Sequence, residues 1–200
     1  MRQETERAPR FARPFFALFL AVAAAVLAAS GVLALRRAAA DRANLATGNA
    51  KWIWLRLDFP ETRALHFRAW KEFRLEAKPS SAAAKLFVDP RGTLTINSTS
   101  FPATEQRPGS PLRLLDAAPA LVAGVNRVAI EAESPTGAGG ILFSLDLPDG
   151  KSIVSDSSWK VLSLDPDHPS EERPAAVWGR PPMYPWGYPG SRGKSIVDGQ

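Results

Sequence analysis

The residues of this sequence best suited to binding chemistry lie around Trp70. His66, Arg68, Glu72 and Arg74 are each an even number of residues away from it. In an extended strand these side chains point to one face. An aromatic ring beside hydrogen-bonding groups can stack on a sugar ring and bind its hydroxyl groups. Burial of Trp70 under a loop or under the C-terminal tail explains the same pattern, so two alternatives stay open.

The acidic residues form no recognisable catalytic pair. Glycoside hydrolysis needs two carboxyl groups about 5 to 9.5 Å apart. Four acidic residues have no neighbouring signature that would mark them for this role: Asp89, Asp116, Glu131 and Asp156. The chain has no cysteine, and His66 and His168 lie about a hundred residues apart. We therefore expect no enzyme activity, no cofactor and no metal site.

The positive charge of the chain is concentrated near its N-terminus. The net charge is +5, but six of the 25 basic residues and only two of the 20 acidic ones precede residue 38. The remaining residues are close to neutral, with 19 basic against 18 acidic side chains. A nearly neutral domain argues against nucleic acid as a partner.

An uncharged segment over residues 14–35 predicts a transmembrane anchor. As a helix its 22 residues would span about 33 Å, enough for a hydrocarbon core of about 30 Å. A cleaved signal peptide is the alternative, but the apolar stretch is long for one and Arg36-Arg37 ends it. We expect a short basic tail over residues 1–13, a tether over 36–50, and a single-pass protein whose C-terminal domain lies outside the cytoplasm, periplasmic or extracellular.

The rest of the chain alternates apolar and polar residues in short runs between turns rich in proline and glycine. Such runs begin at Trp52, span Leu65 to Leu75, and recur around Leu86, Leu94, Val128 and Ile141. Eight or so strands with this pattern predict an all-β sandwich or jelly roll. The one helical candidate is the segment 111–122.

Several motifs, taken in order, resemble the N-terminal sugar-binding-type, galactose-binding-like domain of α-L-rhamnosidases and family 2 glycoside hydrolases. They are Trp52-Ile53-Trp54, Phe67-Arg68, residues 84–88, Leu94-Thr95-Ile96-Asn97, Asp116, residues 121–124 and 126–131, Gly139-Gly140-Ile141-Leu142, Ser155 to Lys160 and Pro185-Trp186-Gly187. The resemblance covers residues 50–188, so we expect the sandwich over 51–188 and a flexible tail over 189–200. Asn97-Ser98 stands where the family often has Asn-Gly, and residues 89–93 replace its usual run toward an aromatic residue.

The resemblance implies a module without the catalytic domain of those enzymes. Relatives of such a module often bind carbohydrate at the loops of one end. The candidate ligand-binding residues are therefore Trp70, His66, Arg68, Asp89, Arg91 and Asn97. We expect a membrane-anchored, extracytoplasmic, non-catalytic carbohydrate-binding module. The alternatives are a protein-interaction or scaffold subunit of a membrane complex, and an accessory domain of a separately encoded glycoside hydrolase.

Overall fold

The computed structural model describes residues 20–33, 47–56, 63–167, 169, 171–187 and 189. The chain divides into two compact units, Met1–Asn44 and Leu45–Gln200. The first unit contains a helix over residues 20–33. Within the described residues, no helix has both the length and the apolar character needed to cross a membrane.

The predicted anchor over residues 14–35 therefore stays a prediction. The helix over 20–33 falls inside it, and residues 14–19 and 34–35 lie outside the described residues. The predicted basic tail and most of the predicted tether also lie outside them. Of the tether, residues 47–50 form a turn in which the Ala50 N–H donates to the carbonyl of Thr47 at 3.1 Å.

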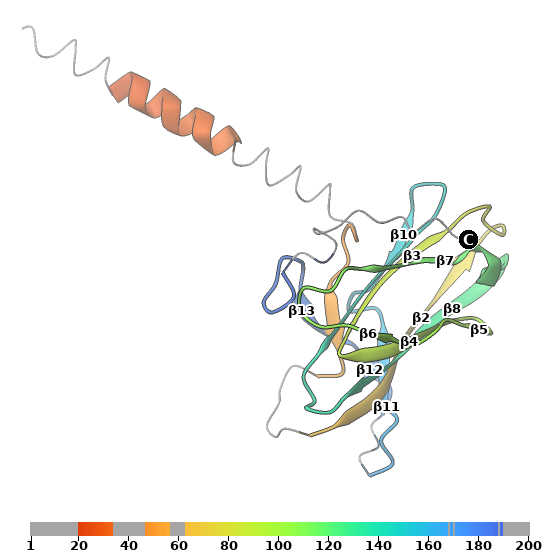
Figure 1. Ribbon diagram of the computed structural model, residues 1–200. Coiled ribbons are helices and arrows are strands. Elements are labelled where there is room, and N and C mark those ends of the chain that lie inside the picture. The colour runs from red at the N-terminus through yellow and green to blue at the C-terminus, as the bar shows by residue number, and fades with distance from the viewer. Residues whose placement is uncertain are drawn as a thin grey trace, which may run out of the picture. The chain divides into compact units, whose positions relative to one another are not determined.

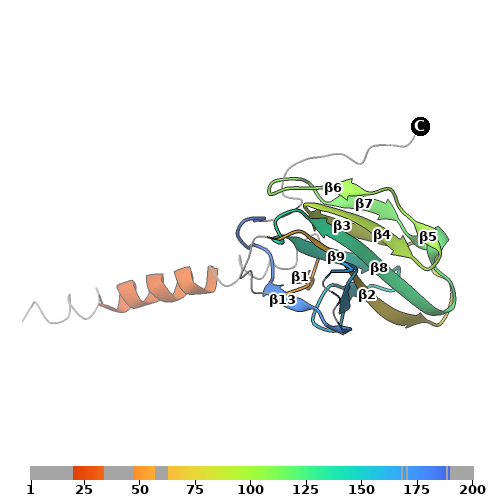
Figure 2. The same ribbon diagram turned by 90° about the horizontal axis from the view of Figure 1, so that it is seen from below.

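The second unit is a sandwich of two antiparallel sheets (Figures 1 and 2). The first sheet has the order β13-β1-β9-β3-β7, and β10 also pairs with β9. The second sheet has the order β12-β11-β2-β8-β4-β5, and β6 also pairs with β4. The strands are β1 (Trp52–Trp54), β2 (Leu65–Leu75), β3 (Ala83–Asp89), β4 (Arg91–Ile96), β5 (Thr99–Ser100), β6 (Thr104–Glu105), β7 (Arg113–Asp116), β8 (Gly124–Ser134), β9 (Gly140–Asp146), β10 (Ser152–Val154), β11 (Lys160–Ser163), β12 (Arg173–Pro174) and β13 (Ala176–Gly179). The expectation of an all-β sandwich is confirmed.

The main core lies between the two sheets, where alternation along each strand places the apolar residues. Leu65, Phe67 and Ala69 of β2 are buried, and Phe73 and Leu75, which have the same parity, pack against the core. Burial of this kind stabilises by about 25 cal/mol per Å² of apolar surface removed from water. The predicted parity of the longest strand is therefore correct.

A turn anchored by two asparagines fixes the register of β4 beside β8. Asn97 has a φ of 53°, a left-handed conformation that asparagine tolerates better than most residues. Its Nδ2 donates to the Ala120 carbonyl at 2.8 Å and to Asn126 Oδ1 at 2.9 Å, and its Oδ1 accepts from the Arg127 N–H at 2.9 Å. This turn aligns Thr93 and Thr95 with the outward residues of β8.

One local expectation is wrong. The helical candidate over 111–122 is instead β7 followed by a single 3-10 turn, Ala118–Ala120. Prolines 111 and 119 limit a helix here, and pairing with β3 lets Leu115 pack against the core. Between β3 and β4 the connection consists of Pro90 alone, because β3 ends at Asp89 and β4 begins at Arg91.

The C-terminal segment covers the outer face of the first sheet. There Trp52, Phe87 and Leu142 form a second apolar cluster with Trp186. The rings of Trp52 and Trp186 stack with centroids 4.3 Å apart, and β13 pairs with β1. This aromatic segment therefore packs back onto the sandwich through Trp186, whereas Tyr184 is 92% exposed.

Candidate functional site

The outer face of the second sheet is polar, in contrast to the outer face of the first. His66, Arg68, Trp70 and Glu72 alternate along β2 with the residues that enter the core. The register places Glu133, Glu131, Ala129 and Arg127 of β8 beside them, and Arg91, Thr93 and Thr95 of β4 beyond β8. Four of the six predicted ligand-binding residues, His66, Arg68, Trp70 and Arg91, therefore share one face.

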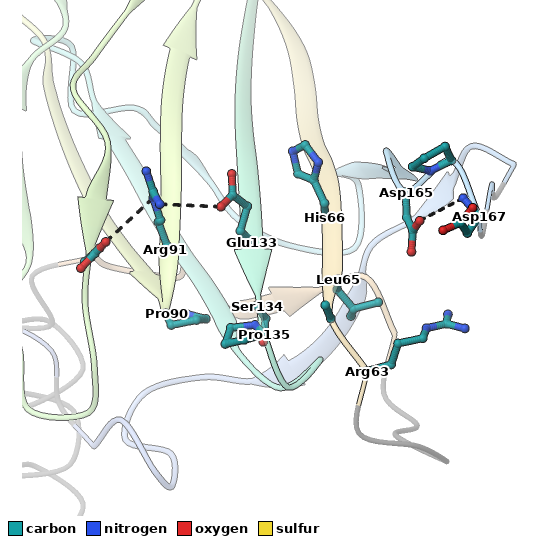
Figure 3. A pocket seen from close by; sticks show the side chains of 13 residues that line it. Arg63, Leu65, His66, Pro90, Arg91, Glu133, Ser134, Pro135, Asp165 and Asp167 are labelled. Carbon is teal, nitrogen blue, oxygen red and sulfur yellow. Dashed lines mark hydrogen bonds and ion pairs between the residues drawn. The ribbon is translucent and has the colours of Figure 1, made fainter.

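A cleft of about 800 Å³ opens where this face meets the loops at one end of the sandwich. Figure 3 shows His66, Glu133 and Arg91 side by side on β2, β8 and β4, with Arg63 and Asp165 on loop segments to one side. Pro90, Pro135 and Pro166 line part of the cleft with apolar surface. The cleft thus combines apolar surface with several hydrogen-bonding groups, as small-molecule sites do.

The charges in the cleft are paired loosely. The Arg91 guanidinium lies 3.9 Å from Glu133 and 4.0 Å from Glu105, and all three side chains are more than half exposed. Exposed pairs of this kind contribute about 0 to 1 kcal/mol. The guanidinium and both carboxylates can therefore turn toward a ligand at little cost. The His66 side chain makes no hydrogen bond within the described part of the chain, so it is also available.

Trp70 is buried, with only 7% of the residue exposed, but neither of the expected covers, a loop or the C-terminal tail, accounts for this. Side chains of neighbouring strands cover Trp70. The Arg127 guanidinium of β8 lies 5.1 Å from the centroid of the ring, and Lys160 of β11 is the register partner of Trp70. A smaller hollow of about 390 Å³ adjoins it, also lined by Glu72 and Glu172. Trp70 therefore offers no open face on which a sugar ring could stack.

Asp89 and Asn97 do not reach the cleft. Asn97 uses its side chain in the turn between β4 and β5, as described above. Asp89 ends β3 in the other sheet, where its Oδ2 accepts a hydrogen bond from Trp186 Nε1 at 2.6 Å. Asp89 therefore helps to hold the C-terminal segment.

We expect Asp89→Asn to change how stability depends on pH. Burial raises the pKa of Asp89 above its ordinary value of 3.8, and the hydrogen bond from Trp186 offsets this only in part. The folded protein therefore binds a proton that the unfolded chain has already lost, so the contribution of Asp89 to stability falls as pH rises from 3.8 through the raised pKa. Asparagine does not titrate and still accepts from Trp186, so the variant should lose less stability over this interval.

Urea unfolding at several pH values between about 4 and 6 measures this difference. Asp116→Asn is a suitable control because Asp116 is exposed at the end of β7. Equal pH slopes for the wild type and Asp89→Asn would contradict the expected role of Asp89.

Several residues of the cleft are not among the six predicted from the sequence. Glu133 has the same outward parity on β8 as Arg127 and Glu131, which is a usable signal. Glu105 and Asp165 carry none, because they reach the cleft from the short strand β6 and from the segment after β11.

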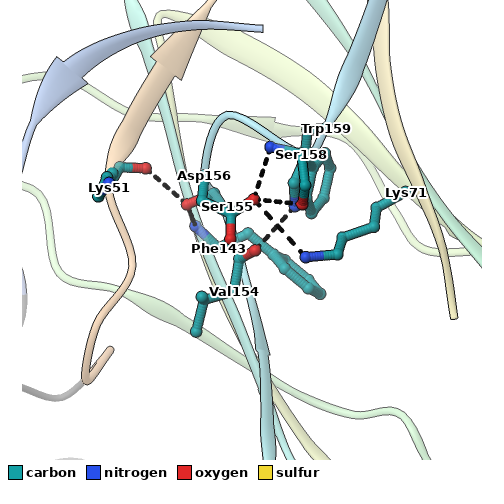
Figure 4. Close-up of polar contacts among 8 residues, drawn as sticks. All are labelled: Lys51, Lys71, Phe143, Val154, Ser155, Asp156, Ser158 and Trp159. Atoms are coloured by element: carbon teal, nitrogen blue, oxygen red, sulfur yellow. Dashed lines mark hydrogen bonds and ion pairs between the residues drawn. The ribbon is translucent and has the colours of Figure 1, made fainter. Parts of the chain in front are cut away.

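The motif Ser155 to Trp159 holds the fold together (Figure 4). Ser155 Oγ donates to the Lys51 carbonyl at 2.6 Å and accepts from the Phe143 N–H at 3.0 Å. Burial raises the pKa of Asp156, but hydrogen bonds from Ser158 and the nearby charge of Lys71 outweigh it and lower that pKa. These interactions connect the residue before β1, β9 and the segment before β11, so this part of the resemblance helps to hold the fold together.

The described residues contain no group of three or more histidine, cysteine, aspartate or glutamate residues that could hold a metal ion.

The fold of the second unit is an antiparallel β-sandwich, consistent with the galactose-binding-like domain that the sequence motifs resemble. The sequence matches no protein-family profile and no curated protein. In structure it is similar to part of the α-L-rhamnosidase of Streptomyces avermitilis complexed with L-rhamnose, with a TM-score of 0.60 and 20% identity over 70% of this chain and 15% of that one.

Two further solved structures have the same fold over a similar stretch. The GH78 rhamnosidase of Bacillus sp. GL1 matches with a TM-score of 0.62 and 18% identity over 71% of this chain and 19% of that one. The lectin from Pleurotus ostreatus in complex with GalNAc matches with a TM-score of 0.57 and 20% identity over 70% and 44% of the two chains. This chain therefore spans less than half the length of each, and the likeness establishes the fold.

Proposed function

We propose that this chain is a non-catalytic carbohydrate-binding module, held to a membrane by residues 14–35 with its sandwich outside the cytoplasm. The observation that carries the binding proposal is the cleft, where His66, Arg91 and Glu133 present hydrogen-bonding groups from three adjacent strands. The fold likeness to a lectin crystallised with GalNAc and to a rhamnosidase crystallised with L-rhamnose supports the same ligand class. The membrane part of the proposal is motivated by the sequence of the segment 14–35.

In the proposed complex, the Arg91 guanidinium donates to sugar oxygens and Glu133 accepts from sugar hydroxyls. Hydrogen bonds that involve one charged group contribute about 1.5 to 3 kcal/mol each. Pro90 and Pro135 lie against the carbon faces of the sugar and exclude water. His66 adds a donor or an acceptor from the neighbouring strand.

Arg91→Ala is expected to weaken glycan binding about tenfold or more, since one charge-assisted interaction is lost. The full chain, kept in a detergent without a sugar headgroup, would be screened on a glycan array and then titrated with the best hit, L-rhamnose and N-acetylgalactosamine. Arg107→Ala is the matched control, because Arg107 is an exposed loop residue away from the cleft.

No binding by the folded wild type to any glycan would overturn the proposal and favour the scaffold alternative. Equal affinities of Arg91→Ala and Arg107→Ala would show that glycan binds elsewhere on the sandwich.

A further inference from the structure

Beyond the cleft, the polar outer face of β2, β8 and β4 carries two further hollows, which together with the residues between them we call the track. Next along the strands lies one of about 280 Å³, lined by Arg68, Thr93, Thr95, Ser100 and Glu131 among others. Arg127 borders this hollow and also the one beside Trp70. Successive outward residues of a strand are about 6.6 Å apart, so the path from His66 to Glu72 is about 20 Å long.

The side chains along this track have unused hydrogen-bonding capacity. Thr93 and Thr95 point outward from β4 and are half-buried. Their hydroxyl groups make no hydrogen bond within the residues that the structure describes. Each hydroxyl can both donate and accept, as the hydroxyl groups of a sugar do.

The charges along the track are compensated one by one. Arg68 pairs with Glu131, Lys160 lies 2.5 Å from Glu172, and Arg127 is opposite Glu72 in the strand register. A surface of paired charges offers no net field to attract a polyanion. Its complementary ligand is polar and uncharged.

We propose that the outer face of β2, β8 and β4 binds an extended, uncharged polysaccharide, with one sugar in the cleft and the following sugars along Thr93, Thr95 and Arg127. This inference rests on the proposed carbohydrate-binding function and extends it to a ligand class and to a second set of contacts. It distinguishes the protein from a module that binds only a terminal sugar in the cleft.

The test compares ligands of increasing length. The full chain in the same detergent is titrated with ladders of uncharged gluco-, manno- and rhamno-oligosaccharides from the monosaccharide upward, with oligogalacturonate as the charged counterpart. Affinity for one uncharged ladder is expected to rise about tenfold or more with length, because two hydroxyl groups of the track gain partners. It should depend little on salt, since net charge does not drive binding.

The double variant Thr93→Val/Thr95→Val removes both hydroxyl groups while it keeps side-chain shape and strand propensity. It should lose the gain with length and keep the affinity for the monosaccharide, whereas Arg91→Ala should weaken both. Monosaccharide binding without a gain with length, or an unchanged gain in the double variant, overturns the inference and leaves the proposed function standing. Stronger binding of oligogalacturonate overturns the uncharged ligand class, and no binding of any ladder overturns both proposals.

Discussion

Trp159→Ala is expected to lower the free energy of unfolding by about 3 to 5 kcal/mol, the usual cost of removing a large buried aromatic side chain. Trp159 is 0% exposed in the main core. Its ring meets Phe143 edge to face with centroids 5.4 Å apart. The alanine would leave a cavity between the sheets that the rigid strands around it cannot close.

The indole N–H of Trp159 contributes separately from its ring. It donates to the Val154 carbonyl at 2.8 Å, while the Trp159 carbonyl accepts from the Ala175 N–H at 2.8 Å. Trp159→Phe keeps most of the ring volume but leaves the Val154 carbonyl without this donor, which costs about 1 to 3 kcal/mol. The phenylalanine variant should therefore fall between the alanine variant and the wild type.

Urea unfolding followed by far-UV circular dichroism measures these differences without relying on the fluorescence of the replaced residue. Tyr184→Ala is the control, because Tyr184 is 92% exposed and its removal should change stability by less than about 0.5 kcal/mol. If Trp159→Ala cost no more than this control, Trp159 would not be a central contact of the core.

The same packing explains why the sandwich could be predicted from the sequence. Alternation between apolar and polar residues identified the inward side chains of β2, because burial of one face is decided locally along a strand. The segment 111–122 was misinterpreted because a short run with spaced leucines suits a helix or an edge strand equally well.

The cleft could be predicted only in part, because it depends on which strands become neighbours. His66 and Arg68 were found from their parity on one strand. Glu133 joins His66 only through the register between β2 and β8, and Arg91 joins Glu133 only through the register between β8 and β4. No local pattern contains these long-range pairings.

The burial of Trp70 and the role of Asp89 were hidden for the same reason. The exposure of Trp70 is decided by Arg127 on the next strand. The partner of Asp89 is Trp186, in the C-terminal segment. Each outcome depends on a residue far away in the sequence.

Trp186→Ala and Gly140→Ala are expected to act on one contact, and their effects should therefore be non-additive. A β-carbon at Gly140 would come within 2.8 and 2.9 Å of ring atoms of Trp186 and 3.0 Å of Trp52. Trp186 stacks on Trp52 and is 8% exposed. Gly140→Ala should therefore push Trp186 off the outer face, at a cost of about 1 to 3 kcal/mol.

Once Trp186 is already absent, most of the steric conflict at Gly140 disappears. Trp186→Ala alone should cost about 3 to 5 kcal/mol, and adding Gly140→Ala to it should cost clearly less than in the wild type. We expect an interaction free energy of about 0.5 to 3 kcal/mol between the two substitutions, measured by a double-mutant cycle in urea.

Gly139→Ala supplies the contrasting cycle. A β-carbon at Gly139 would lie 2.2 Å from the Asp89 carbonyl oxygen and 2.5 Å from the ring of Trp54. The strand backbone and a core ring cannot move away as the C-terminal segment can, so loss of Trp186 should not relieve this conflict. Additive costs for Gly140→Ala with Trp186→Ala would show that Trp186 is not held against Gly140. Coupling in the Gly140 cycle, together with near-additivity in the Gly139 cycle, would place the C-terminal segment on the outer face of the first sheet. The polar face of the second sheet would then be free for a ligand.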